Sequence, residues 1–285
     1  MAVVLALCSA IAYGLSDFIG GAASRRSAAW PVAVVAQCSS TVCVLAVALV
    51  WPGSPTGPAL AWGAVAGLGS GLGTGFLYRG FATGRMSVVS PVSAVGAAAV
   101  PVLVGVATGE RPSAIVWAGI ILALPAIWAV SAVPGPARGT IDGSRRTEPF
   151  GGGLVEGVLS GLGFGGLFAA LGQVPSSAGL LPLVAANAVS VPTVVLLATA
   201  LRSPWRPRSR SVWWAVAAGP FGAAATAAFL LASQRGYLSV AGVLSSLYPA
   251  TTVLLAVALL HERVHRVQAL GLALCALAIA LVVGG

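Results

Sequence analysis

The sequence has very few charged residues. Asp, Glu, Lys and Arg make up 7% of its 285 residues, against roughly 25% in an ordinary soluble domain. Hydrophobic residues make up 58%, and the mean hydropathy is +0.98. This composition excludes a soluble globular domain and indicates an all-α polytopic membrane protein.

Lysine is missing altogether, and all 15 basic residues are arginines. The net charge of +9 would suit a nucleic-acid partner, but the arginines lie in connections between apolar runs, so we expect no nucleic acid and read them as topology signals. Arg111 and Arg235 fall on one side of the membrane. The thirteen others fall on the second side, at positions 25, 26, 79, 85, 138, 145, 146, 202, 206, 208, 210, 263 and 266. The positive-inside rule makes the second side cytoplasmic and places both termini outside the cell membrane.

Cysteine is scarce, and the four cysteines have no spacing typical of a metal site or a disulfide framework. No basic residue precedes the first apolar run, so we expect a retained helix there and not a signal peptide. We expect no cofactor and no bound metal.

Apolar runs long enough to cross a bilayer recur along the whole chain. A span needs about 20 helical residues, and ten runs meet that length. The predicted spans are 2–22, 28–51, 58–78, 87–108, 114–133, 153–172, 178–201, 212–232, 237–260 and 266–283.

The chain nearly repeats itself with a shift of 152 residues. Matching pairs include Trp62 and Trp214, Gly67 and Gly219, Thr74 and Thr226, Ser93 and Ser245, and Gly119 and Gly271. Each copy holds five spans, and an odd number inverts the second copy in the membrane. The sequence therefore predicts two inverted five-helix repeats, 1–133 and 153–285, joined by a polar cytoplasmic linker, 134–152.

Two further features occur in both copies. A Glu-Arg corner precedes the last span of each copy, at 109–111 and 261–263, and an aromatic-glycine step lies in each first span, at 13–14 and 164–165. Together with the duplication, these features resemble the EamA domain of the drug/metabolite transporter superfamily, present twice. Tyr13 departs from the tryptophan common in that family, and termini outside the cell depart from many relatives.

The resemblance implies a ten-helix bundle around a central cavity that moves small organic solutes by alternating access. Its partners would be a small-molecule substrate, protons as the coupling ion and the lipid bilayer.

Two acids fall inside predicted spans, where a charge is costly and a functional role is the default hypothesis. Asp17 lies late in span one and Glu156 early in span six, so we expect both at a similar depth on the cytoplasmic half, opposite one another. Burial favours the protonated form of a carboxyl group, as proton coupling requires. Tyr13 and Ser160 lie one turn away on the same faces. The alternative is a hydrated acid near the interface.

Other polar side chains within spans are candidates for the substrate route. Gln37 in span two and Asn187 in span seven are the first choices, followed by Ser190 and Tyr248. The alternative role for each is a hydrogen bond between helices. The corner glutamates Glu110 and Glu262 are expected to act structurally, as caps at helix ends.

Residues 261–265 read HExxH, the zincin signature. The first copy has neither histidine, and no usual third ligand follows, so we treat the match as accidental. The function predicted is secondary active transport of small metabolites or drug-like solutes, coupled to protons and directed outward. The first alternative is an uncoupled or uptake permease for a small metabolite. The second, less favoured alternative is a membrane-embedded zinc hydrolase that uses the HExxH segment.

Overall fold

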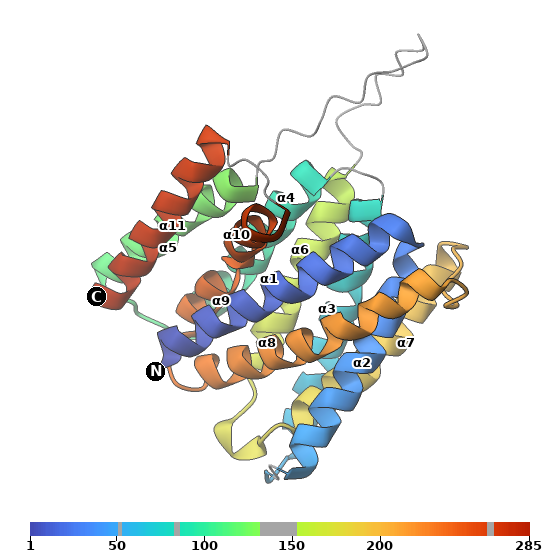
Figure 1. Ribbon diagram of the computed structural model, residues 1–285. Helices are drawn as coiled ribbons and strands as arrows, with labels where there is room; N and C mark the ends of the chain where they lie inside the picture. The colour runs from blue at the N-terminus through green and yellow to red at the C-terminus, as the bar shows by residue number, and fades with distance from the viewer. Residues whose placement is uncertain (51–52, 83–85, 132–152, 261–264) are drawn as a thin grey trace.

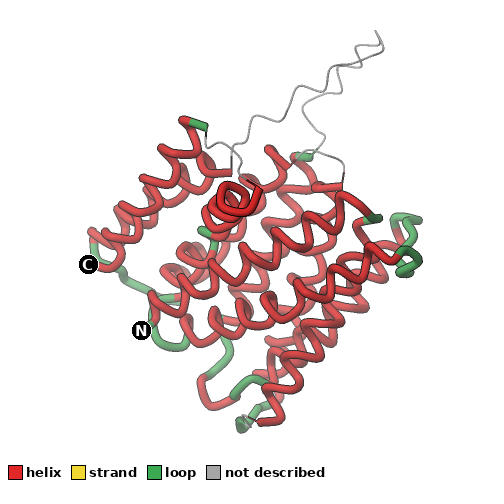
Figure 2. Tube along the Cα trace, viewed as in Figure 1, coloured by secondary structure: helices red, strands yellow, loops and turns green. Residues whose placement is uncertain are grey.

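A computed structural model describes residues 1–50, 53–82, 86–131, 153–260 and 265–285, and within these ranges the chain is a bundle of helices without strands (Figures 1 and 2). The predicted linker 134–152 and residues 261–264 lie outside the described ranges. The α-helices are α1 (Ala2–Arg26), α2 (Ala29–Val50), α3 (Gly57–Ala82), α4 (Met86–Ala107), α5 (Ala114–Ser131), α6 (Leu154–Leu171), α7 (Leu181–Ala200), α8 (Ala218–Ser233), α9 (Leu238–Ser245), α10 (Tyr248–Leu260) and α11 (Arg266–Gly284).

The prediction of ten membrane spans is confirmed. Ten helical segments of the described chain are long and apolar enough to cross a membrane. Most ends agree with the predicted ends within three residues. The main differences are that α1 and α3 each continue four residues further, to Arg26 and Ala82. These extra turns end beside arginines, which suits helix ends at the membrane surface.

Two spans are less regular than the hydropathy indicates. Span eight begins with a 3-10 helix, η2 (Arg210–Ala217), before α8, and span nine is broken into α9 and α10. The break lies at Ser246 and Leu247, just before Pro249. A proline has no backbone N–H to donate to the preceding turn, so the helix restarts at that point.

Glycines let α3 pack closely between α6 and α7. A side chain at Gly69 would meet the carbonyl of Gly163 in α6, 2.6 Å from its Cβ. A side chain at Gly71 would meet Thr193 of α7 at 2.6 Å. Alternate glycines of α3 therefore serve two different neighbours, as small residues spaced by four do in membrane bundles.

Matching contacts connect the two halves. The hydroxyl of Ser9 in α1 donates to the carbonyl of Ala225 in α8 at 2.9 Å, and the hydroxyl of Ser160 in α6 donates to the carbonyl of Gly73 in α3 at 3.0 Å. Ser160 lies 151 residues after Ser9, and Ala225 lies 152 after Gly73. The first span of each half is thus fastened to the third span of the other half. These contacts support two related halves, while their inverted orientation stays a prediction.

The corner glutamate of the first half fastens a helix of the second half. The Glu110 carboxylate accepts the backbone N–H groups of Leu238 and Ser239, the latter at 3.1 Å, at the start of α9. Arg111 donates to the carbonyl of Glu110 and forms no ion pair with its carboxylate within the described chain. Glu110 therefore acts as a cap, as expected, but the helix that it caps is α9 of the second half. Glu262 lies outside the described residues.

Candidate functional site

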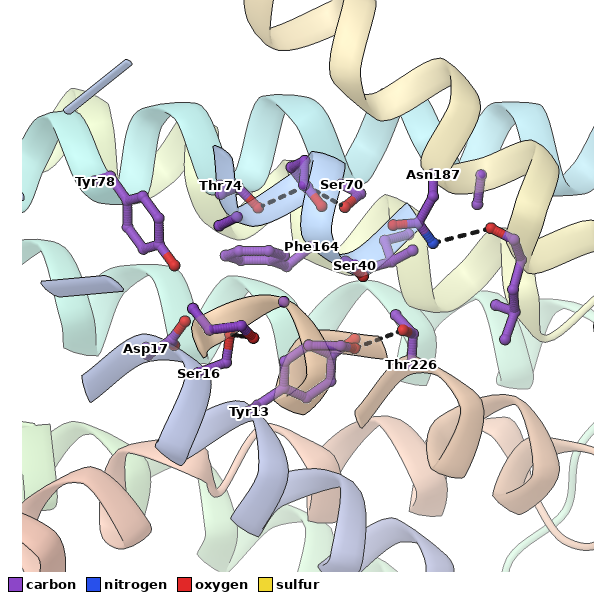
Figure 3. A pocket seen from close by; sticks show the side chains of 18 residues that line it. Tyr13, Ser16, Asp17, Ser40, Ser70, Thr74, Tyr78, Phe164, Asn187 and Thr226 are labelled. Carbon is purple, nitrogen blue, oxygen red and sulfur yellow. Dashed lines mark hydrogen bonds between the residues drawn. The ribbon is translucent and has the colours of Figure 1, made fainter. Parts of the chain in front are cut away.

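A cavity lies in the middle of the bundle, lined by three helices of each half (Figure 3). These are α1, α2 and α3 from the first half, and α6, α7 and α8 from the second. It leaves about 50 Å³ for water-sized molecules, which is room for a few waters. Polar lining side chains come from Tyr13, Ser16, Asp17, Gln37, Ser40, Ser70, Thr74, Tyr78, Asn187 and Thr226, and the rest of the wall from Ala36, Phe164, Leu167, Leu183, Ala186, Ala218, Gly219 and Gly222.

Asp17 gives one end of the cavity its charge. Among the described residues that line the cavity, it is the only acid, and none is basic. Figure 3 shows Tyr78 of α3 reaching toward it. Gly20, one turn after Asp17, makes room for this, because any side chain at Gly20 would overlap the Tyr78 hydroxyl. Within the described chain, no hydrogen bond or ion pair reaches the Asp17 carboxylate.

Amide groups occupy other parts of the wall, and Asn187 lies across the view from Asp17 (Figure 3). The Asn187 side chain donates from Nδ2 to the carbonyl of Leu183 at 3.0 Å, which leaves its Oδ1 free to accept. Gln37 donates from Nε2 to the hydroxyls of Ser70 and Thr74 at 2.9 and 3.1 Å. Its Oε1 is also left as an acceptor. The cavity is therefore rich in hydrogen-bond acceptors.

Aromatic rings pack beside the cavity. Phe168 of α6 stacks on Phe229 of α8, with ring centroids 4.2 Å apart, and Tyr13 meets Phe168 edge-on at 5.7 Å. Tyr248 lies next to Tyr13, at 6.3 Å. Phe168 and Phe229 each follow a lining residue, Phe164 or Thr226, toward the end of the bundle that carries the N-terminus (Figure 1). The rings thus fill the bundle on that side.

The structure gathers half of the predicted site residues. Tyr13, Asp17, Gln37 and Asn187 line the cavity, whereas Ser190 and Tyr248 are buried outside its lining. Ser160 is also outside; besides its bond to α3, its hydroxyl lies 2.8 Å from that of Ser93 in α4.

Glu156 is not opposite Asp17 across the cavity, contrary to the expectation. It lies in the first turn of α6, where its Oε2 accepts the N–H of Gly153 at 3.1 Å. Its Oε1 lies 3.9 Å from Nε of Arg79, at the end of α3. A carboxylate in this position accepts a hydrogen bond from a backbone N–H that has no partner within the helix. The positive end of the helix dipole also stabilises its negative charge. Glu156 is thus at the end of its helix, whereas α1 continues nine residues beyond Asp17, so the two acids do not lie at the same depth.

One polar stripe that lines the cavity was not predicted from the sequence. Ser70, Thr74 and Tyr78 recur every four residues along α3 and all line the cavity. This spacing places side chains on one helical face, and the match of Thr74 with Thr226, also a lining residue, was a second signal. Both patterns are present in the sequence, but the many glycines of α3 drew attention to helix packing and not to these polar residues.

The described chain contains no group of three or more His, Cys, Asp or Glu residues placed to hold a metal ion. Four residues of the HExxH segment, 261–264, lie outside the described ranges, so this statement does not cover them.

The model of the EamA-like transporter family matches residues 151–284. This half of the chain is similar to the EamA-like transporter family. The family is part of the drug/metabolite transporter superfamily, whose members are transporters and not enzymes. The ten apolar helices of the described chain fit a multi-pass membrane protein, and its second half is similar to a family that moves small solutes.

One solved structure, described only as "Crystal structure of protein", shares the fold over almost the entire length. It is similar at a TM-score of 0.68 and 18% identity, and the alignment covers 99% of this chain and 98% of that chain. Among curated proteins, none matches. The structural likeness extends the common fold to the first half, which the family model does not cover.

Proposed function

We propose that this EamA-like protein exports a small organic solute in exchange for protons, by alternating access, with Asp17 as the proton-binding group. The observation that carries the proposal is the Asp17 carboxylate itself. It is the only acid of the described cavity lining, and it lacks a hydrogen-bond or ion-pair partner in the described chain. An acid kept in an apolar bundle without a partner is costly, and such acids mark ion and substrate pathways.

Asp17 has two ways to become neutral. It can bind a proton, or it can bind a positively charged part of the solute. A site that holds one or the other exchanges them across the membrane when the bundle changes the side to which it opens. The same group therefore provides the coupling.

The aromatic rings suit the closed side of such a cycle. Phe168, Phe229, Tyr13 and Tyr248 form one cluster of contacting rings, in which Phe168 and Phe229 follow lining residues toward the end that carries the N-terminus. The positive-inside rule predicts that this end is extracytoplasmic. We therefore assign the rings to an outer barrier, with the cavity loaded from the cytoplasmic side.

The lining also favours one class of solute. Asp17, Gln37 and Asn187 offer acceptor atoms, and no basic side chain of the described lining offers a positive charge. An anionic solute would therefore be disfavoured, and a compact solute with amine or hydroxyl donors would be favoured.

The test compares extracellular metabolites from cells that express the native chain with those from cells that express Asp17→Asn at matched protein levels. Asn preserves the size of the side chain and removes its charge. Glu156→Gln is the matched control, because it neutralises an acid that does not line the cavity. We expect a solute to accumulate outside with the native chain and with Glu156→Gln, but not with Asp17→Asn.

Other outcomes lead to different functions. If the solute leaves equally fast with Asp17→Asn, the protein is an uncoupled permease. If the native chain depletes a solute from the medium, it is an uptake permease. Stoichiometric zinc in the purified protein, lost on His261→Ala, would instead support the hydrolase.

A further inference from the structure

A second cavity lies at the surface, beside the loop that joins α7 to η2. It encloses about 320 Å³ and is lined by Thr199, Arg202, Ser203, Pro204, Trp205, Arg206 and Arg208. Three of its seven lining residues are arginines, and none is acidic. We call it the arginine pocket.

The arginines of this pocket have no carboxylate partner within the described chain, where the one ion pair joins Arg79 to Glu156. Arg206 lies over the ring of Trp205, 5.5 Å from its centroid. This stacking orients the guanidinium without neutralising it. The pocket therefore presents several uncompensated positive charges and fork-shaped donors.

Arg202 adopts a backbone conformation that usually belongs to glycine. Its φ is +51°, and it is the one non-glycine residue of the described chain with a positive φ. The N–H of Arg202 bonds to the carbonyl of Thr199 at 3.0 Å, and the N–H of Ser203 bonds to that of Ala198 at 2.8 Å. This is a Schellman end of α7, in which the left-handed position favours glycine. An arginine at this position carries backbone strain that a glycine would avoid, which indicates a use for its side chain.

The pocket also lies at the expected level of the membrane surface. α7 ends at Ala200, and the next span begins at Arg210. Trp213 and Trp214 of η2 are 57% and 72% exposed, as in the aromatic belts that lie at headgroup level. The hydroxyl of Ser27, just after α1, lies 2.6 Å from that of Ser211, and this holds the loop against the bundle (Figure 1).

We infer that the arginine pocket binds the phosphate of an anionic phospholipid headgroup, with the acyl chains lying along the exposed apolar side of η2 and the end of α7. Guanidinium groups bind phosphate oxygens in pairs. The arginine bias places this loop at the cytoplasmic leaflet, where anionic lipids attract basic segments. The inference does not depend on which solute the central cavity takes.

The test measures lipid binding by the purified full chain after lipid removal, by native mass spectrometry with phosphatidylglycerol or phosphatidylcholine. Arg206→Gln/Arg208→Gln removes two charges from the pocket. Arg235→Gln/Arg266→Gln removes two exposed charges elsewhere and is the matched control. We expect the native chain and the control to retain phosphatidylglycerol, and the pocket variant to lose about 5-fold in affinity for each arginine removed, or roughly 25-fold together.

Arg202→Gly separates a binding role from a folding role. Glycine fits the positive φ without strain, so we expect unchanged or higher thermal stability together with weaker phosphatidylglycerol binding. If Arg202 serves only the negative end of the α7 dipole, stability falls and lipid binding is unchanged, which overturns the assignment.

Three other results also overturn it. Equal binding of phosphatidylcholine would show that the pocket does not select for a net negative charge on the headgroup. Equal losses in the pocket variant and the control would show a general attraction between charges. Displacement of the lipid by inorganic phosphate, but not by chloride at the same ionic strength, would assign the pocket to a soluble phosphate compound.

Discussion

The first helices of the two halves, α1 and α6, share their packing but differ in the chemistry they bring to the cavity. Ser9 and Ser160 make the same kind of bond to the other half. One to two turns later, however, α1 carries Tyr13, Ser16 and Asp17, whereas the positions 151 residues further on in α6 are Phe164, Leu167 and Phe168. The duplicated residues fasten the bundle, and the diverged residues give it one charged wall and one apolar wall.

This asymmetry has a physical reason. Two unpaired carboxylates facing one another in a small cavity would repel, and one would stay protonated. A single acid against an aromatic wall avoids that competition. It also lets the apolar wall exclude water on the side that must close.

The largest effect is expected from removing the charged wall. Losing a hydrogen bond to a charged group costs about 1.5–3 kcal/mol, so Asp17→Asn should weaken solute binding by about ten- to hundredfold. Asp17→Glu keeps the charge and should lose less. Binding of the solute found in the metabolite comparison, measured on purified protein, checks this. Equal losses for both variants would mean that shape matters at this position and charge does not.

The two phenylalanines of α6 should differ in how much they stabilise the fold. Phe168 is 1% exposed and stacked on Phe229, whereas Phe164 lines the cavity. Phe168→Ala should lower the free energy of unfolding by about 3–5 kcal/mol. Phe164→Ala should lower it less, because the cavity already borders that ring. Denaturant unfolding in detergent measures both. A greater loss at Phe164 would contradict the division.

The corner contact tests how one half holds the other. Glu110→Ala removes the acceptor of two N–H groups at the start of α9, and a lost cap costs about 1 kcal/mol. We expect a lower melting temperature and faster hydrogen exchange at Leu238 and Ser239. Arg111→Gln, at an exposed side chain that bonds only to a carbonyl, is the control. Unchanged exchange at both amides would exclude the cap.

The smallest effects should come from the duplicated serines. An interhelical hydrogen bond in a membrane is worth about 0.6 kcal/mol, so Ser9→Ala and Ser160→Ala should each lower stability by roughly that amount. Ser160→Ala should cost slightly more, because Ser160 also contacts Ser93. Parallel thermal unfolding of the two variants makes the comparison. A large loss in only one of them would mean that the two bonds are not equivalent.

The architecture could be predicted from the sequence because membrane spans are set by length and hydropathy alone. All ten were identified, and the shift of 152 residues marked two halves that make similar contacts, such as the bonds of Ser9 and Ser160. Pro249 predicted either a kink or a break in span nine, and the sequence could not decide between them, because prolines in membrane helices often cause only a kink. Whether a proline ends a helix depends on the neighbours that satisfy the freed carbonyls.

The site was predicted in part for a related reason. Tyr13, Asp17, Gln37 and Asn187 were chosen as polar groups at membrane depth, and they line the cavity. Glu156 satisfied the same criterion but lies in the first turn of α6. Hydropathy locates a span only to within a few residues, so it did not show that Glu156 lies at the helix end. It also says nothing of rotation around the helix axis, which depends on tertiary packing. A four-residue polar period, as in Ser70, Thr74 and Tyr78, carries that missing information.

The last helix of each half packs against its counterpart. A side chain at Gly119 of α5 would meet Val282 of α11 at 2.8 Å, and one at Gly271 of α11 would meet Ala129 of α5 at 2.8 Å. During synthesis, α5 enters the membrane long before α11 has been translated. The glycine face of α5 therefore has no partner until the final span is made. A chain whose synthesis stops before Arg266 would leave this face without its partner helix.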